Sequence, residues 1–330
     1  MKLSISEIRE IAQGVEFLEQ QADGIRFSRF SPREWEVFPG STAAECAAGV
    51  QLEFVTDGDE LYLDCLIRES IAIRSFFAVD VLVEGKPAGS LQNFDETVSR
   101  EVYADKVFPF GTYTGKFPLG QGRKKVAVLF PHSALVTLRE LRLRNATILE
   151  PVKRPKVLLA YGDSITQGYD ALHPRNTYVR RLADHLDMEL FNKGVGGDRF
   201  RPELVGRNTA VTPDCITVAY GTNDWNGGDR QRFEMDCAAM LQSLADQYPG
   251  VPVYVISPLW RWDADRDRNG WSFREIEEII EKNAARFLQI RFIRGMDLVP
   301  HDNRFFGDGI LHPNDEGFAC FLNRLVEKIN

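Results

Sequence analysis

The pattern of apolar and polar residues in this sequence changes near residue 151, and that change limits the possible folds more than any other feature. Beyond it, short apolar runs alternate with stretches of helical periodicity, which is typical of βαβ units and a parallel sheet. Right-handed crossovers place such helices on both faces of the sheet. We expect five strands, at 156–160, 189–192, 215–219, 253–257 and 291–293, and helices at 176–186, 230–247, 272–288 and 314–329.

The first 150 residues carry many strand signals and few helical ones. Alternating apolar runs at 51–55 and 61–67 flank Asp57-Gly58-Asp59 and predict a hairpin. Further strand-like runs follow between turn clusters, and one short helix is expected around Ile5 to Leu18. This pattern predicts an antiparallel, jelly-roll-like β-sandwich. The later runs lie at 76–83, 125–130 and 135–143.

A linker with two prolines, Pro151 to Pro155, separates the strand-rich part of the sequence from the part in which strands and helices alternate. We therefore predict a β-sandwich domain over 1–150 and an α/β domain over 151–330, a division that suits a chain of 330 residues. The α/β part is expected to be a three-layer α/β/α domain of flavodoxin type with a five-stranded parallel sheet.

Charge and hydropathy exclude two classes of partner. A net charge of −8 argues against nucleic acid and anionic membranes, because phosphate binding needs a basic face. No apolar run approaches the roughly 20 residues of a membrane span. Acidic residues stand where a signal peptide would have its apolar core, so we expect a cytoplasmic protein, although a secreted or periplasmic one without its leader would look the same.

The five cysteines are scattered and form no CxxC pair, which indicates reduced thiols. No His, Asp and Glu residues show the spacing of metal ligands, so neither a metal nor a cofactor is expected. The sequence leaves the oligomeric state open.

Four polar clusters follow the predicted strands or precede the last helix. They are Gly162-Asp163-Ser164, the glycine-rich segment 192–198, the segment 220–226 around Asn223, and the segment 306–314 around His312. Because ligands bind beyond the carboxyl ends of parallel strands, we expect the clusters to face one crevice. Asp163 and Ser164 alone could also be an ordinary turn and helix cap.

Together these residue types fit acyl transfer. A serine hydroxyl needs a base such as histidine, and a carboxylate on the other ring nitrogen fixes the tautomer of that base. Backbone N–H groups and an asparagine amide can hold the oxyanion that forms during attack on an ester.

The four clusters resemble, in order, the sequence blocks of the SGNH (GDSL-type) hydrolases. The resemblance covers residues 156–330 and implies Ser164 as nucleophile, His312 as general base and Asp308 as its orienting acid. It also implies the oxyanion donors Ser164, Gly197 and Asn223. One departure is that Asp308 and His312 are four residues apart, whereas the family has three, so Asp302 is kept as a substitute for Asp308.

Three side chains are candidates for substrate contact. Trp225 and Trp260 could stack on a sugar ring or cover an acyl chain, and could equally be buried packing residues. His173 lies in the loop after the Ser164 segment and could line the pocket.

The expected function is a serine esterase acting on a small-molecule or carbohydrate ester. Two-domain members of the family are often similar to esterases that deacetylate sugars, which favours a carbohydrate acetyl esterase. A lysophospholipase or short-chain acyl esterase is the first alternative. A carbohydrate-binding protein that has lost catalysis is the second, because of the altered spacing.

Overall fold

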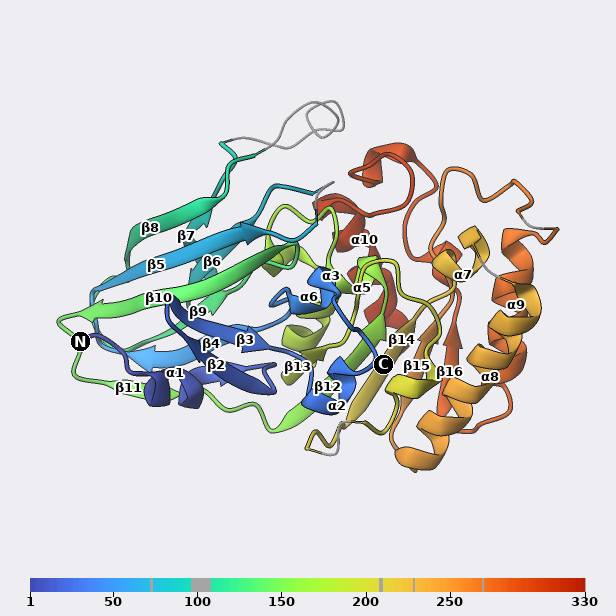
Figure 1. Cartoon of the computed structure of the whole chain (residues 1–330), viewed down its shortest axis with the longest axis horizontal. Helices are drawn as coiled ribbons and strands as arrows, with labels where there is room; N and C mark the ends of the chain where they lie inside the picture. The colour runs from blue at the N-terminus through green and yellow to red at the C-terminus, as the bar shows by residue number, and fades with distance from the viewer. Residues whose placement is uncertain (72–73, 96–107, 208–209, 228, 269, 330) are drawn as a thin grey trace.

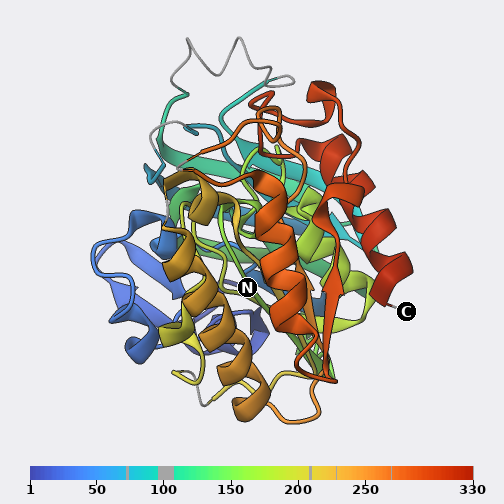
Figure 2. The ribbon, with the colours of Figure 1, turned by 90° about the vertical axis from the view of Figure 1, so that its right-hand side faces the viewer.

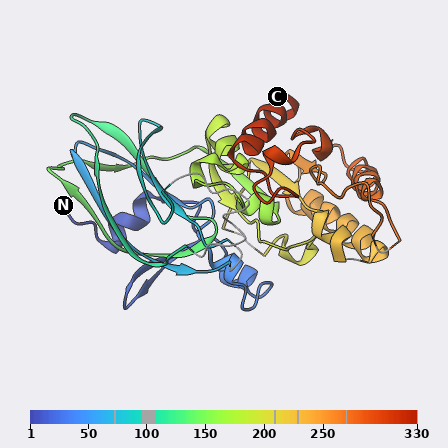
Figure 3. The same ribbon diagram turned by 90° about the horizontal axis from the view of Figure 1, so that it is seen from above.

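The computed structural model describes residues 1–71, 74–95, 108–207, 210–227, 229–268 and 270–329. A β-rich part and an α/β part lie side by side along the longest axis of the molecule (Figures 1 and 3). Strand β11 (Leu149–Pro151) still pairs with a strand of the β-rich part, and β12 (Lys156–Gly162) opens the α/β part. The predicted domain boundary at residue 151 remains a prediction.

The α/β part is built on a five-stranded sheet in which every neighbouring pair is parallel. The strand order is β13-β12-β14-β15-β16, which is the flavodoxin-like order 2-1-3-4-5. Each of the five predicted strands is present, with ends moved by two residues at most. Besides β12 they are β13 (Met188–Asn192), β14 (Cys215–Ala219), β15 (Val253–Ile256) and β16 (Ile290–Ile293).

Helices cover both faces of this sheet because successive strand residues point to opposite sides. Leu158 and Ala160 pack with α6 (Tyr178–His185) and α10 (Asp315–Ile329). On the other face, Leu159 and Tyr161 share a core with α8 (Arg230–Gln247) and α9 (Phe273–Ala284), which lie side by side in Figure 2. None of the helices in the described residues is long and apolar enough to cross a membrane.

The β-rich part consists of two antiparallel sheets with an apolar core between them. The orders are β1-β4-β9-β6-β7, with β11 beside β4, and β2-β3-β10-β5-β8. The predicted fold class, a sandwich followed by a flavodoxin-like domain, is therefore confirmed. The strands are β1 (Ala12–Gln13), β2 (Phe17–Gln21), β3 (Gly24–Ser28), β4 (Gln51–Thr56), β5 (Glu60–Glu69), β6 (Ala78–Val83), β7 (Lys86–Gln92), β8 (Gly111–Pro118), β9 (Lys124–Leu129) and β10 (Ala134–Arg144), and the helices are α1 (Ile5–Ile11), α2 (Pro32–Trp35) and α3 (Thr42–Glu45).

The predicted hairpin between 51–55 and 61–67 is wrong, because β4 and β5 belong to different sheets. β4 pairs with β1, β9 and β11, whereas β5 pairs with β8 and β10. The Asp57-Gly58-Asp59 connection crosses between the sheets, and the Asp57 carboxylate accepts hydrogen bonds from the backbone N–H groups of Thr147 and Ile148. A turn signal predicts a reversal of the chain, but it does not say which strands pair.

Candidate active site

Ser164 lies where strand β12, between β13 and β14 in the sheet, turns into the one-turn helix α5 (Ser164–Gln167). The turn is tight, since a Cβ at Gly162 would lie 2.1 Å from the Thr166 hydroxyl oxygen. Asp163 is the N-cap, and its carboxylate accepts a hydrogen bond of 2.9 Å from the N–H of Ile165. The helix-cap interpretation is therefore true of Asp163, and it leaves the Ser164 hydroxyl free to face the loop of His312.

His312 joins Ser164 to Asp308 through its two ring nitrogens. The Ser164 Oγ lies 2.8 Å from Nε2, and Nδ1 lies 2.6 Å from a carboxylate oxygen of Asp308. With the proton on Nδ1 donated to Asp308, Nε2 has a lone pair that can accept the hydroxyl proton of Ser164. Ser164 thus forms one hydrogen-bonded chain with an acid and a histidine that lie near the C-terminus of the sequence.

The four-residue spacing of Asp308 and His312 is accommodated by a turn organised around the same carboxylate. The second oxygen of Asp308 accepts hydrogen bonds from the backbone N–H groups of Ile310, Leu311 and His312, at 2.9, 2.8 and 3.2 Å. Gly309 adopts a φ of +68°, which costs a glycine little. The turn holds Asp308 in place while its other oxygen reaches the imidazole.

Burial alone would raise the pKa of Asp308, but the hydrogen bond and charge of His312 and the backbone donors outweigh it and leave the pKa well below its ordinary value. The acid is therefore ionised at neutral pH. Asp302, the substitute considered from the sequence, instead accepts a hydrogen bond from the N–H of Arg304.

The predicted oxyanion donors lie on segments that contact one another. Gly197 is exposed, with a φ of +80°, and Asn223 belongs to α7 (Thr222–Gly227) after β14. The Asn223 amide donates a 2.9 Å hydrogen bond to the carbonyl of Asp198, the residue after Gly197. An amide nitrogen carries two hydrogens, so a second donor remains on Asn223. The roles of Gly197, Asn223 and the Ser164 N–H as oxyanion donors stay predictions.

The β-rich part holds the glycine-rich segment in place through buried hydrogen bonds and ion pairs. The Arg29 guanidinium, 1% exposed, donates to the carbonyls of Asn192 and Gly194 at 2.8 and 2.7 Å. The fully buried Lys193 ammonium lies 2.8 Å from Glu16 and 2.9 Å from Glu34. We call these residues of the β-rich part together with Lys193 the loop anchor, and the anchor fixes the segment that leads to Gly197.

Two further acids beside the site are buried, Asp163 and Asp224. Burial raises the pKa of each to about 7. Each carboxyl is a neighbour in sequence of a predicted functional residue, Ser164 or Asn223. Both groups therefore titrate near neutral pH and contribute to the pH dependence of the folded state.

One of the three predicted substrate contacts is corrected by the structure. Trp225 is 0% exposed, packs on Phe273, and donates its indole N–H to the carbonyl of Trp271. It is a core residue, which was the alternative interpretation of its aromatic ring. A substrate has no access to it.

The other two candidates remain partly accessible. His173 is held by the buried Asp80 of β6, with 2.8 Å between Nδ1 and the carboxylate, and its side chain is 15% exposed. Trp260 is half-buried and stacks on His301. Trp262, on the same loop as Trp260, is 53% exposed, and its backbone N–H donates to the carbonyl of Ile310, two residues before His312.

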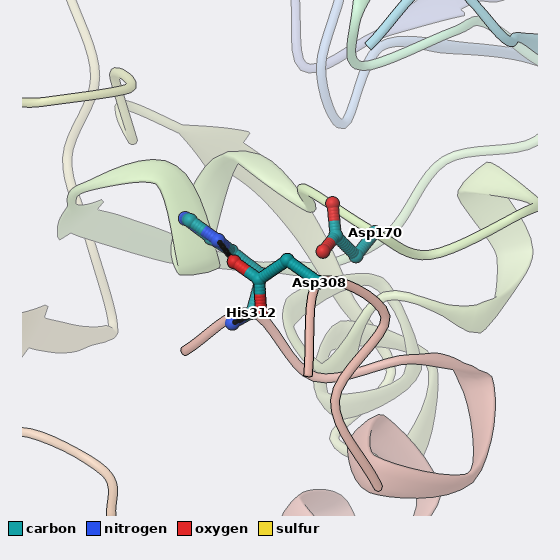
Figure 4. A group of neighbouring side chains, drawn as sticks. All are labelled: Asp170, Asp308 and His312. Carbon is teal, nitrogen blue, oxygen red and sulfur yellow. Dashed lines mark hydrogen bonds and ion pairs between the residues drawn. The ribbon is translucent and has the colours of Figure 1, made fainter. Parts of the chain in front are cut away.

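The structure also assembles a cluster that sequence spacing did not indicate. Asp170, Asp308 and His312 offer ligand atoms within 4.8 Å of one another (Figure 4). Among them lies a cation from the β-rich part, because the Arg74 guanidinium donates to Asp170 at 2.6 Å and lies 2.8 Å from His312 Nδ1. The carboxylates therefore already face a positive charge supplied by the chain itself.

The fold, the strand-end serine and the hydrogen-bonded histidine define a class, the SGNH-type carboxylic ester hydrolases. Residues 160–320 match the model of the GDSL-like Lipase/Acylhydrolase family, and this part of the chain is a domain of that family. The resemblance recognised in the sequence is thereby confirmed. No curated protein matches the chain.

Solved structures share the architecture of the whole chain. The salicylyl-acyltransferase SsfX3 from a tetracycline biosynthetic pathway has a TM-score of 0.79 at 20% identity, covering 96% of this chain and 93% of its own. A family two carbohydrate esterase from Cellvibrio japonicus has a TM-score of 0.66 at 16% identity, covering 100% and 96%. Another from Clostridium thermocellum, in complex with cellohexaose, has 0.64 at 15% identity, covering 86% and 93%. At these identities the likeness shows a shared fold.

Proposed function

We propose that this protein is a serine esterase that removes a short acyl group, such as acetyl, from a carbohydrate. The observation that carries the proposal is the hydrogen-bonded chain from Ser164 Oγ through His312 to Asp308, with distances of 2.8 and 2.6 Å. Asp308 completes this chain despite its four-residue spacing, which removes the reason to consider a binding protein without catalysis.

In the proposed mechanism, the Ser164 oxygen attacks the ester carbonyl while His312 Nε2 takes the hydroxyl proton. Asp308 stabilises the imidazolium that forms. The Ser164 N–H, the Gly197 N–H and the Asn223 amide hold the oxyanion, where each donor of this kind typically contributes about 10²–10³ to kcat. The alcohol leaves with the proton from His312, and a water activated by the same nitrogen hydrolyses the acyl-enzyme.

A short acyl group is chosen by analogy with the two-domain members of the family that are similar to sugar-deacetylating esterases. A long acyl chain would need a deep apolar channel.

A carbohydrate as the alcohol is favoured by the exposed aromatic surface near the base. Trp262 presents its ring to solvent on a loop that is hydrogen-bonded to the His312 loop, and aromatic faces stack on sugar rings. The carbohydrate esterases named above share the fold of the chain, which supports this choice by analogy.

The test has two parts. A fluorophosphonate probe should label the wild-type protein and fail to label Ser164→Ala, which should also lose activity on p-nitrophenyl acetate by at least about 10³-fold. Probe labelling that persists in Ser164→Ala would overturn the proposed nucleophile.

Substrate choice is tested separately, with acetylated xylosides compared against p-nitrophenyl esters of increasing chain length. We expect acetylated sugar to give the highest kcat/KM and activity to fall steeply beyond four acyl carbons. Rising activity with chain length would favour a lysophospholipase or general acyl esterase instead.

A further inference from the structure

Arg74 is the one residue of the β-rich part for which the structure gives a contact with the proposed catalytic histidine among the described residues. It lies between β5 and β6, and its side chain is 5% exposed. Its Nε donates to Asp170 at 2.6 Å, while one terminal nitrogen lies 2.8 Å from His312 Nδ1 and 3.7 Å from an oxygen of Asp308. The guanidinium plane lies over the ring of Tyr169, 4.6 Å from its centroid.

Asp170, which accepts the hydrogen bond of this guanidinium, itself has an unusual backbone conformation. Asp170 has a fully buried side chain and a φ of +69°, which is uncommon for a residue other than glycine. A Cβ at Gly307, next to Asp308, would lie 2.7 Å from the Cβ of Asp170, so the two loops approach as closely as their backbones allow. Figure 4 shows the Asp170 carboxyl facing the pair formed by Asp308 and His312.

Arg74 and Asp308 compete for a hydrogen bond with His312 Nδ1. If Nδ1 carries its proton, it donates to Asp308 and leaves Nε2 free to accept from Ser164. If Nδ1 instead accepts from Arg74, the ring proton is on Nε2 and the base is blocked. The productive tautomer therefore requires that Arg74 be directed to the two carboxylates, and the bond to Asp170 does this.

We propose that Arg74 is a positioning residue of the active site. Held by Asp170, its guanidinium keeps Asp308 and the imidazole of His312 aligned with Ser164, so that the β-rich part completes the catalytic centre. This inference rests on the proposed function, because it assigns a role relative to the proposed base.

The charges around the imidazole give the proposal a signature beyond a loss of activity. The groups that face His312 are Ser164 and Tyr169 from α5 and its following segment, Asp170 from the same segment, Asp308 from its own loop, and Arg74 from the β-rich part. Arg74 and Asp170 offset each other, so Asp308 remains as the single net negative charge beside the ring. A change at either member of the pair alters this balance in opposite directions.

The experiment compares Arg74→Met, Arg74→Lys and Asp170→Asn in the full chain, with kcat and kcat/KM on p-nitrophenyl acetate measured from pH 5 to 9. Arg74→Met should lower kcat about 10–100-fold, since misplacement by about 1 Å has such effects, and should move the acid limb of kcat/KM to higher pH by about one unit or more. Asp170→Asn should also lower kcat but move the acid limb to lower pH.

Arg74→Lys separates charge from geometry, because lysine keeps the charge but cannot bridge the same partners. Its acid limb should stay near that of the wild type while kcat falls by about tenfold or more. Arg142→Met is the matched control, as Arg142 is a half-exposed arginine of β10 paired with Glu140, and it should leave both readouts unchanged.

Circular dichroism and fluorophosphonate labelling of Ser164 report whether each variant is folded and whether the nucleophile is reactive. If folded, labelled Arg74→Met and Asp170→Asn keep the wild-type kcat and acid limb, the role of Arg74 is refuted while the proposed function stands. If the wild-type protein itself shows no labelling, the proposed function fails first. Should Arg74→Met not fold, Arg74→Lys and Asp170→Asn decide by the same two readouts.

Discussion

At the scale of single residues, the site depends on one carboxylate that does two different jobs. One oxygen of Asp308 accepts a hydrogen bond from the Nδ1–H of His312, and the other accepts hydrogen bonds from three backbone N–H groups of the same turn. The first contact orients the base. The second set of bonds restrains the conformational freedom of the loop and so keeps the carboxylate in position. Because of these backbone bonds, a longer spacing between acid and base still gives a short hydrogen bond.

This dual role predicts the effect of Asp308→Asn. The amide can keep one acceptor for the backbone but loses the negative charge that stabilises the imidazolium, so kcat should fall by about 10³–10⁴-fold with only a modest loss of stability. Steady-state kinetics and thermal denaturation check both parts. Asp302→Asn is the control, since Asp302 contacts Arg304 and not the imidazole, and an equal loss in Asp302→Asn would contradict the assignment of Asp308.

At the scale of elements, the strands of the parallel sheet were predictable because their signal is local. Each strand is a short, mainly apolar run, and the predicted ends of β14 and of helix α8 coincide with the observed ones. The choice of strand partners is not local, which is why the hairpin of β4 and β5 was predicted wrongly.

The same reasoning separates what was foreseen at the site from what was missed. Ser164, His312 and Asp308 stand in short segments with a recognisable pattern, and the structure brings them together. Arg74 has no such pattern, because its partners Asp170 and His312 are 96 and 238 residues away along the chain. The burial of Trp225 likewise depends on distant packing from α9 and its N-terminal flank, so the sequence left its role open.

The loop anchor gives a prediction at this scale. Lys193→Met would leave Glu16 and Glu34 buried without their cation, so the free energy of unfolding should fall by about 3–5 kcal/mol. Activity should fall as well, because Lys193 lies in the segment that leads to Gly197. Urea denaturation and kinetics on p-nitrophenyl acetate measure the two effects.

Two further variants check this prediction, one that removes a buried carboxylate as well and one that removes a lysine outside the loop anchor. Adding Glu34→Gln to Lys193→Met should restore part of the lost stability, since one uncompensated carboxylate is removed. Lys125→Met should change stability by less than about 0.5 kcal/mol, because the Lys125 side chain is half-exposed and its ion pair with Glu53 is long at 3.5 Å. A Lys193→Met protein as stable as Lys125→Met would show that the anchor contributes nothing.

At the scale of the whole molecule, the two parts are joined by buried polar contacts. Gln167 of α5, three residues after Ser164, donates to the carbonyls of Ala43 and His132 in the β-rich part. His132 is 4% exposed, and a Cβ at Gly168 would lie 3.1 Å from its ring. The imidazole is therefore packed directly against the helix that carries the proposed nucleophile, so its protonation is coupled to the integrity of this junction.

Burial lowers the pKa of His132 from an ordinary 6.5 to about 4. The unfolded chain then binds a proton between these two values that the folded chain does not, so this group stabilises the fold fully above pH 6.5 and loses its contribution as the pH falls towards 4. The largest possible loss is about 3 kcal/mol. Asp163 and Asp224, with pKa values raised to about 7, act in the opposite direction over the same range, so the comparison must be between variants.

We therefore expect His132→Gln to be less stable than the wild type at pH 8, because glutamine packs less well beside Gly168, and to lose less stability on acidification. The measurement is the free energy of unfolding in urea at several pH values from 4.5 to 8, plotted as the difference between variant and wild type. That difference should move in favour of the variant below pH 6.5. His185→Gln, at an exposed position in α6, is the control for replacing a surface histidine. Parallel pH profiles for His132→Gln and the wild type would mean that the buried imidazole at the junction does not govern acid stability.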